Sequence, residues 1–264
     1  MELNQKDIFK KRLCSKITFF VMLVGLYIIS AVLAGFKNGT AFFSIPSGII
    51  WLFQKFIPTK NSVQYFPVIL DSAIKTILLS ISSTMVSATF ALFLSIIGSN
   101  TTGINIVTKI ISKIIASFFR NMPVVAWSLI LLFSFKQSEF TGFLSLFFIT
   151  FGYLTRAFSE TIDEVATDNI EALKSTGASY LQIIFCGVFP AVFPQFLSWL
   201  LYFIENSIRE ATLIGILTGT GIGFTFNLYY RSFRYDAAGL VILIVTIIVI
   251  SIELLSNKLR SEMM

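Results

Sequence analysis

Long apolar stretches recur along this chain of 264 residues, and they restrict its fold more than any other feature. Several reach about 20 residues, the length that a helix needs to cross roughly 30 Å of hydrocarbon. Hydrophobic residues make up 55% of the sequence and charged residues 13%, about half the charged share of an ordinary soluble domain. Because backbone groups inside a bilayer must pair internally and no alternating strand pattern is present, we predict an all-α integral membrane protein.

The charged residues exclude several classes of function. The net charge is +6, but lysine and arginine are spread over the predicted loops, so we interpret them as topology signals and expect no nucleic-acid partner. The chain has no histidine and only two cysteines, Cys14 and Cys186. Histidine catalysis and a zinc site are therefore excluded, and we expect no catalytic residue, bound metal or bound cofactor.

The apolar stretches predict six transmembrane helices. A basic arm, residues 1–16, precedes the first stretch and favours a cytoplasmic N-terminus. A cleaved signal peptide is the alternative for this segment, but its apolar core is longer than the usual ~7–15 residues. Lys258 and Arg260 favour a cytoplasmic C-terminus. The spans are expected at residues 17–36, 68–97, 124–135, 143–158, from 191 onwards and at 237–255.

The segments between these spans have recognisable patterns. Residues 37–66 are expected to form an outside loop with Pro46, Pro58 and Pro67 as breakers, within a first domain of residues 17–66. Residues 104–119 predict an amphipathic helix at the cytoplasmic surface, with Lys109 and Lys113 on its polar side. Residues 213–236 are rich in glycine and are expected outside the cell or as a re-entrant segment.

A polar loop at residues 160–190 interrupts the apolar stretches. Asp168 and Glu171 have the spacing of a helix N-cap and its return partner, which predicts a short helix from about Asn169. Gly177 is expected to end this helix, because glycine readily adopts the left-handed conformation of a helix C-terminus. Ser179 can cap a second helix, which we expect Pro190 to limit.

This loop resembles the coupling loop of ATP-binding-cassette (ABC) importer permeases. In that family Glu-Ala-Ala is followed by three residues, Gly, nine residues, a hydrophobic residue, any residue, Leu and Pro. Glu171, Ala172, Gly177 and Pro190 match this pattern. The chain departs from it in three places, with Leu173 for the second alanine, Gly187 for the hydrophobic residue and Phe189 for the leucine.

Further motifs resemble the phosphonate-type permeases, the PhnE-like proteins. They are Arg120 with Pro123, Pro194-Gln195-Phe196, Glu205 and Arg209 four residues apart, Ala211-Thr212, and the glycine-rich turn from Gly219 to Gly223. The glycine turn differs from the family at Thr218 and Thr220. The resemblance implies a type I ABC importer permease core (MetI-like) over residues 67–260, in which Asp168, Glu171, Ala172, Gly177 and Pro190 form the ATPase-docking loop.

The same resemblance implies the function and the partners. The chain would be a multi-pass permease of the bacterial cytoplasmic membrane that imports a phosphonate or a related phosphorus oxyanion. Its partners would be lipid, a second permease subunit (a homodimer, or a heterodimer with a sister permease), two copies of an ABC ATPase and an extracytoplasmic binding protein. ATP and magnesium would bind to the ATPase, since the chain has no Walker-type sequence.

The fifth span contains charged residues that allow two interpretations. Burying Glu205 or Arg209 at mid-bilayer costs ~2.5–3.5 kcal/mol, so each needs a partner or a wet path. At four residues apart they can form a structural ion pair, or Arg209 can attract an anion within a translocation path. Glu210 lies beside them in sequence. Gly219, Gly221 and Gly223 are candidates for a gate or for dimer packing.

Three other assignments remain open at the level of sequence. A methionine-type or quaternary-amine-type ABC permease would have the same core. An ion-coupled secondary transporter would need no ATPase, although no inverted repeat is visible. An integral-membrane enzyme is disfavoured, because the chain has no histidine, buried carboxylate pair or nucleophile motif.

Overall fold

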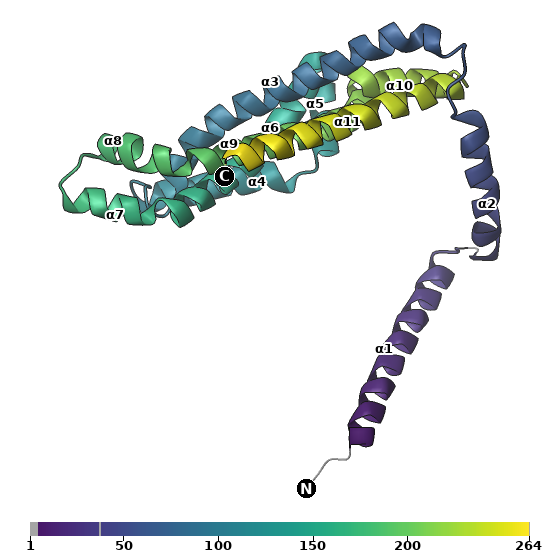
Figure 1. Cartoon of the computed structure of the whole chain (residues 1–264), viewed down its shortest axis with the longest axis horizontal. Helices are drawn as coiled ribbons and strands as arrows, with labels where there is room; N and C mark the ends of the chain where they lie inside the picture. Colours follow the sequence, from purple (N-terminus) through teal and green to yellow (C-terminus); the bar gives the residue numbers. More distant parts are fainter. Residues whose placement is uncertain (1–4, 37, 264) are drawn as a thin grey trace. The chain divides into compact units, whose positions relative to one another are not determined.

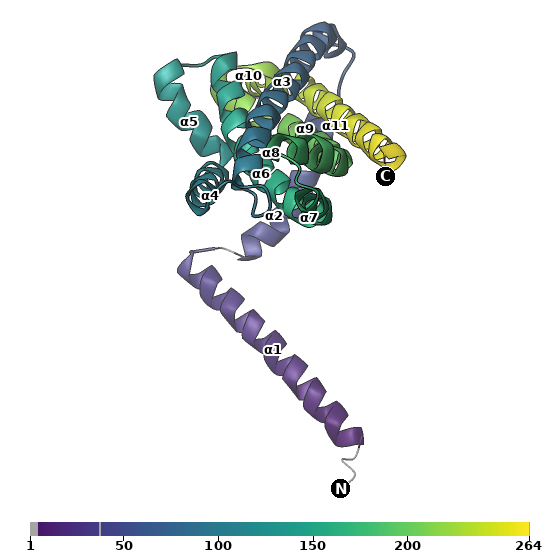
Figure 2. The ribbon, with the colours of Figure 1, turned by 90° about the vertical axis from the view of Figure 1, so that its left-hand side faces the viewer.

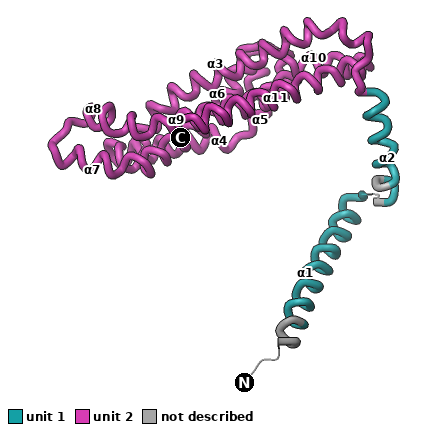
Figure 3. The backbone as a smooth tube through the Cα atoms, viewed as in Figure 1, with its two compact units in different colours: residues 1–55 teal, residues 56–264 magenta. Residues whose placement is uncertain are grey.

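The computed structural model describes residues 5–36 and 38–263, and every regular element within those ranges is helical. The chain divides into two units, residues 1–55 and residues 56–264 (Figure 3). Residues 1–4 of the predicted basic arm, and Lys37 of the predicted outside loop, lie outside the described residues.

The first unit contains two helices, α1 (Gln5–Leu33) and α2 (Asn38–Lys55). The first span and most of the basic arm both belong to α1, whose large apolar side chains from Leu13 to Leu33 are exposed. Such a surface is suited to contact with lipid. Residues 38–55 form a helix, so Pro46 does not act as the expected breaker, while the outside location of this segment stays a prediction. Pro46 removes a single helical hydrogen bond, and its apolar neighbours favour a helix.

The second unit is built on four long helices, α3 (Phe66–Gly98), α6 (Glu139–Val165), α9 (Phe189–Thr218) and α11 (Tyr235–Met263). A short 3-10 turn, η1 (Val63–Tyr65), leads into α3. The helices α3, α6 and α9 lie against one another (Figures 1 and 2). One buried cluster joins them, with Ala88 and Ala91 from α3, Leu154 and Phe158 from α6, and Val192 and Phe196 from α9.

Hydroxyl groups connect the same three helices. The Ser80 hydroxyl donates to the Ser207 carbonyl at 3.2 Å, and the Thr84 hydroxyl donates to the Ser207 hydroxyl at 3.0 Å. On the α6 side, the Ser87 hydroxyl donates to the Phe147 carbonyl at 3.0 Å. Small polar side chains let membrane helices approach closely and bond across their interface. We therefore regard α3, α6 and α9 as one packed group.

The predicted third span is not a straight transmembrane helix. The helix α5 (Val124–Phe135) has 12 residues, which rise only about 18 Å. It follows the amphipathic helix α4 (Ile106–Asn121) at an angle of 88°. Pro123 causes the break, because it has no amide hydrogen for the helix ladder. Among the described residues, five helices could cross a membrane, and the bent pair would make a sixth.

The segment that leads into the fifth span also differs from expectation. A three-residue helix, α8 (Tyr180–Gln182), continues through a wider π-helical turn, η2 (Ile183–Val188), directly into α9. Pro190 lies directly after this wider turn, which interrupts the regular hydrogen-bond ladder where the proline has no amide hydrogen. The proline therefore does not end a separate helix. Instead, one helical segment runs from Tyr180 to Thr218.

The glycine-rich segment is shorter than predicted. Leu213–Thr218 still belongs to α9, and a helix, α10 (Gly221–Arg231), follows after a two-residue turn. This turn and α10 pack against α3 and α11 through a second buried cluster that contains Ile69, Ile222 and Val241. The second unit thus has two recognisable ends, one with the α9–α10 turn and one with the loop between α6 and α9.

Candidate functional site

The predicted coupling loop contains a helix, α7 (Thr167–Ser175), between α6 and α8. The expected start at Asn169 is wrong by two residues, because Ala166 precedes the helix and no side chain caps it. Asp168 is therefore not the N-cap residue. It lies in the first turn, where its negative charge interacts favourably with the helix dipole.

Gly177 ends this helix as predicted. Its φ is +77°, in the left-handed region. The amide of Gly177 donates to the Lys174 carbonyl at 3.1 Å, and the amide of Ala178 donates to the Leu173 carbonyl at 3.2 Å. These two bonds form a Schellman motif, which needs a left-handed residue at this position. Ser179 also behaves as expected, since its amide donates to the Gln182 side chain at 2.8 Å at the start of α8.

The two faces of α7 have different surroundings. Ile170 is buried and belongs to the same cluster as Ile184 and Val188, so one face of α7 is packed against η2. The opposite face is exposed, and it includes Asp168, Asn169, Glu171, Ala172, Lys174 and Ser175. The candidates Asp168, Glu171 and Ala172 are thus brought together on an accessible surface, with Gly177 at its edge. Pro190 lies on α9, behind η2.

Two departures from the family pattern meet in the structure. A Cβ atom on Gly187 would lie 2.6 Å from Cδ1 of Leu173, which is inside van der Waals contact. The leucine on α7 therefore occupies the space that a side chain at position 187 would fill. The exchange of a large and a small residue keeps α7 in close contact with η2.

Asp163, near the end of α6, holds the turn between α3 and α4. Its two carboxylate oxygens accept five hydrogen bonds from Ser99, Asn100 and Thr101, at 2.6–3.1 Å. Sequence reasoning missed this role, because the partners lie more than 60 positions away. No local motif indicates the contact.

The charged residues of α9 form a larger cluster than the expected pair. Glu205 accepts from Arg209, as predicted, and its other oxygen lies 3.5 Å from Arg260 of α11. Arg209 also lies 3.6 Å from Glu253 of α11. The side chain of Glu205 is 9% exposed and that of Arg209 is 45% exposed. The charges of two carboxylates and two guanidinium groups therefore cancel in this cluster. This favours the interpretation of Glu205 and Arg209 as a structural ion pair. Glu210 lies outside this cluster and accepts from Asn206 at 3.1 Å.

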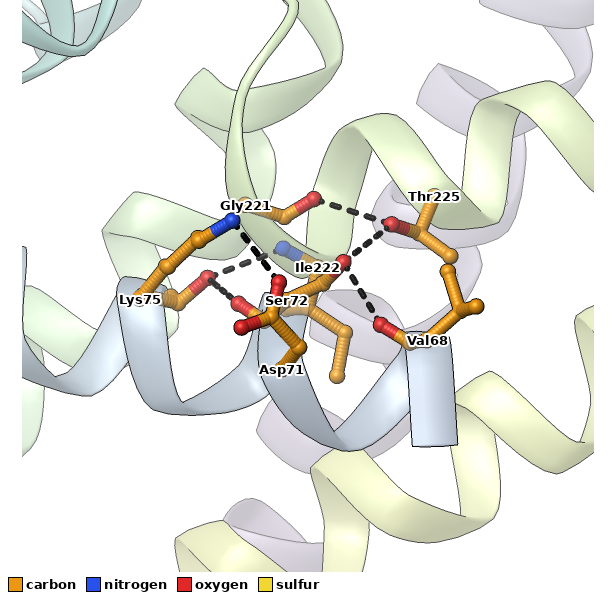
Figure 4. Close-up of polar contacts among 8 residues, drawn as sticks. Val68, Asp71, Ser72, Lys75, Gly221, Ile222 and Thr225 are labelled. Carbon is orange, nitrogen blue, oxygen red and sulfur yellow. Dashed lines mark hydrogen bonds and ion pairs between the residues drawn. The ribbon is translucent and has the colours of Figure 1, made fainter. Parts of the chain in front are cut away.

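The glycine turn is fixed by hydrogen bonds to α3. Gly219 and Gly221 both have left-handed φ values, +71° and +62°. The amide of Ile222 donates to the Thr76 hydroxyl at 2.9 Å, and Thr225 donates to the Ser72 hydroxyl at 2.8 Å (Figure 4). Gly223 is buried where α10 crosses α9, and a Cβ there would overlap the Thr212 carbonyl. These glycines permit close packing within one chain.

An ion pair lies beside this turn. Lys75 and Asp71 are 2.7 Å apart on α3, where a spacing of four residues places them on one helix face (Figure 4). Both side chains are more than half exposed.

Among residues 5–36 and 38–263, no group of three His, Cys, Asp or Glu side chains could hold a metal ion.

Comparison with known proteins identifies relatives of this chain. Residues 91–260 match the family model of the binding-protein-dependent transport system inner membrane component. A candidate cryptic phosphonate transport system permease protein of Escherichia coli (strain K12), PhnE2, is 32% identical over 45% of this chain and 98% of its own length. A candidate phosphite transport system permease protein of Stutzerimonas stutzeri, HtxC, is 28% identical over 80% of this chain and 74% of its own length.

Solved structures share the fold. An inward-facing form of the MetNI methionine ABC transporter aligns with a TM-score of 0.67 at 14% identity, over 78% of this chain and 99% of the other. An amino acid ABC transporter crystallised with histidines aligns with a TM-score of 0.65 at 15% identity, over 76% and 96% of the two chains. At these identities the likeness concerns the fold alone.

Proposed function

This chain belongs to the family of binding-protein-dependent transport system inner membrane components, and we propose that it is the permease subunit of an ATP-driven importer for a phosphorus oxyanion. The main support is α7, a helix with one face packed against η2 and the other exposed at the end of the bundle. The relatives named for phosphonate and phosphite transport support the choice of solute.

In this proposal the exposed face of α7 binds an ABC ATPase. ATP and magnesium bind to that ATPase, and its movement on nucleotide binding is transmitted to α7. Ile170 and Leu173 contact η2, so a displacement of α7 is passed directly to the base of α9. Because packed interfaces change between discrete arrangements, a small shift at α7 can reorient the long helix.

A single α7 in each chain requires two permease copies to match two ATPases. We propose a homodimer, with a binding protein that delivers the solute at the α10 end. The α7 end and both chain termini are then cytoplasmic, in keeping with the basic arm and with Lys258 and Arg260.

We also propose which residues lie along the translocation path. Arg209 belongs to the cluster around Glu205 and is half exposed, so its exposed part would attract an anion when two subunits enclose a wet path. Glu205 has two arginine partners and is better placed to hold α9 against α11. The path and its outer gate would then also include Glu210 and the glycines of the α9–α10 turn region, Gly219, Gly221 and Gly223.

Co-purification tests this proposal. The tagged chain is extracted from cells that also express the ATPase and the binding protein from neighbouring genes. We expect equal amounts of permease and ATPase, and a phosphorus oxyanion bound to the binding protein, detected by ³¹P NMR. A permease that purifies without the ATPase, or a binding protein that carries only an amino acid or a quaternary amine, would contradict the proposal.

A further inference from the structure

A cavity of about 310 Å³ lies between α4 and α6. The turn that joins α3 to α4 contributes to it through Asn100. The same turn shares a neighbouring hollow with Ile170 and Lys174, which places the cavity at the α7 end of the bundle. Its volume is at the lower limit for small-molecule pockets.

The cavity contains more positive than negative charge. Three cations line it, Lys113, Arg120 and Arg156, against the two carboxylates Glu160 and Asp163. Both carboxylates have partners, since Asp163 accepts five hydrogen bonds from the α3–α4 turn and Glu160 lies 2.5 Å from Arg156. The lining therefore has a net positive charge, and within the described residues neither carboxylate forms an ion pair with Lys113 or Arg120.

These two cations retain free donors. Lys113 donates to the neutral side-chain oxygen of Asn100 at 3.1 Å. Within the described part of the chain, the Arg120 guanidinium has no hydrogen-bond or ion-pair partner. A guanidinium group that lines a cavity without an acceptor can bind an anion without first breaking an ion pair.

The backbone fixes the position of the two cations. Lys113, Ser117 and Arg120 are spaced at i, i+4 and i+7, so they lie on one face of α4. Gly152 of α6 lets this face approach closely, because a Cβ there would lie 2.6 Å from the Arg120 amide nitrogen. The cations and the Ser117 hydroxyl are thus held on a rigid helix against α6.

We infer that this cavity binds a phosphorus oxyanion group. The planar guanidinium of Arg120 offers paired donors that match the oxygens of a phosphate or phosphonate, and Lys113 adds a second positive charge. The Ser117 hydroxyl supplies a neutral donor. This site is separate from the Glu205 cluster, and the inference does not depend on which solute the chain transports.

Two sources can supply the same chemical group. One is a free phosphate or phosphonate in the cytoplasm. The other is the headgroup of an anionic phospholipid, since exposed apolar residues of α4, Ile106, Ile110 and Ile114, lie beside the cationic face and are suited to the membrane interface. The experiment therefore measures both sources.

The full chain is purified and placed in nanodiscs of phosphatidylcholine, and inorganic phosphate is titrated at constant ionic strength. Binding is followed by ³¹P saturation-transfer NMR. Retained phosphatidylglycerol is measured in parallel by native mass spectrometry, on protein from nanodiscs that contain this lipid. The variants are Arg120→Gln and Lys113→Gln, and the control is Arg231→Gln, an exposed arginine at the α10 end of the second unit.

We expect wild type and Arg231→Gln to bind at least one of the two ligands saturably. Arg120→Gln should bind it about tenfold more weakly, as the loss of a charge-assisted hydrogen bond predicts. Binding of phosphate identifies the free anion, and retention of phosphatidylglycerol identifies the headgroup. Lys113 is exposed, so its variant keeps the test valid if Arg120→Gln does not fold. Equal binding of both ligands by wild type and by every folded variant would overturn the inference.

Discussion

Leu173 and Gly187 illustrate how two residues share one space. The family pattern has a small residue on the coupling helix and a large one at the position of Gly187. This chain has the reverse, and the leucine fills the volume above the glycine. The contact between α7 and η2 therefore depends on the combined volume of the side chains at positions 173 and 187, and not on which residue stands at either position.

This complementarity predicts a rescue. Gly187→Ile should destabilise the protein by about 1–3 kcal/mol, because a side chain at 187 overlaps Leu173. Adding Leu173→Ala should recover most of the loss, since it restores the total volume. Thermal unfolding of the single and double variants measures the coupling. Strictly additive effects of the two changes would show that these residues do not share a space.

The Glu205 cluster predicts an unequal response to single changes. Glu205→Gln leaves Arg260 without a carboxylate and Arg209 with Glu253 alone, whereas Arg209→Gln leaves Glu205 paired with Arg260. Breaking a fully buried pair costs about 3–5 kcal/mol, and the half-exposed Arg209 lowers that cost here. We expect a lower folded yield for Glu205→Gln than for Arg209→Gln, measured by size-exclusion chromatography. The opposite order would mean that Arg260 does not support Glu205.

At the scale of elements, local sequence signals predicted that α7 and the long helices exist, and they predicted the end of α7 at Gly177. The glycine at 177 and the cap at Ser179 determine where helices end and begin, and both are read from single residues. The joined helix from Tyr180 to Thr218 could not be predicted, because a π-helical turn depends on packing rather than on local preference. The contact between Asp163 and the α3–α4 turn is non-local for the same reason.

The end of α7 supplies a direct test of this element. Gly177→Val places a β-branched residue at φ +77°, which costs roughly 1–2 kcal/mol or more in backbone strain. We expect normal membrane insertion but a loss of permease-stimulated ATPase activity. Gly25→Val is the matched control, since nothing lies within 4 Å of its added Cβ and its φ is not positive. Full ATPase stimulation in Gly177→Val would exclude a docking role for this helix end.

At the scale of the whole molecule, the contacts at the two ends of the bent α4–α5 pair indicate a broken span. The turn before α4 is bonded to Asp163 at the α7 end, and Gln137, which follows α5, donates to the Leu217 carbonyl at 3.3 Å at the α10 end. The pair therefore leads from one end of the second unit to the other, as a sixth crossing requires. Six crossings would place the coupling helix and both termini in one compartment.

Cysteine labelling measures this topology. In a background where Cys14 and Cys186 are serine, we replace Ser175, Ser232 or Ser261, all of which are exposed. A membrane-impermeant thiol reagent should modify Ser232→Cys in intact cells, and Ser175→Cys and Ser261→Cys only after permeabilisation. Labelling of Ser261→Cys in intact cells would contradict six crossings with a cytoplasmic C-terminus.

The most direct test of the proposed function is solute uptake by proteoliposomes that contain this chain with its ATPase and binding protein. We predict accumulation of methylphosphonate that requires ATP and all three components. Phosphite should compete for this uptake, while methionine and choline should not. Accumulation of methionine or choline in place of methylphosphonate, or uptake that persists without the ATPase, would contradict the assignment of an ATP-driven phosphorus oxyanion importer.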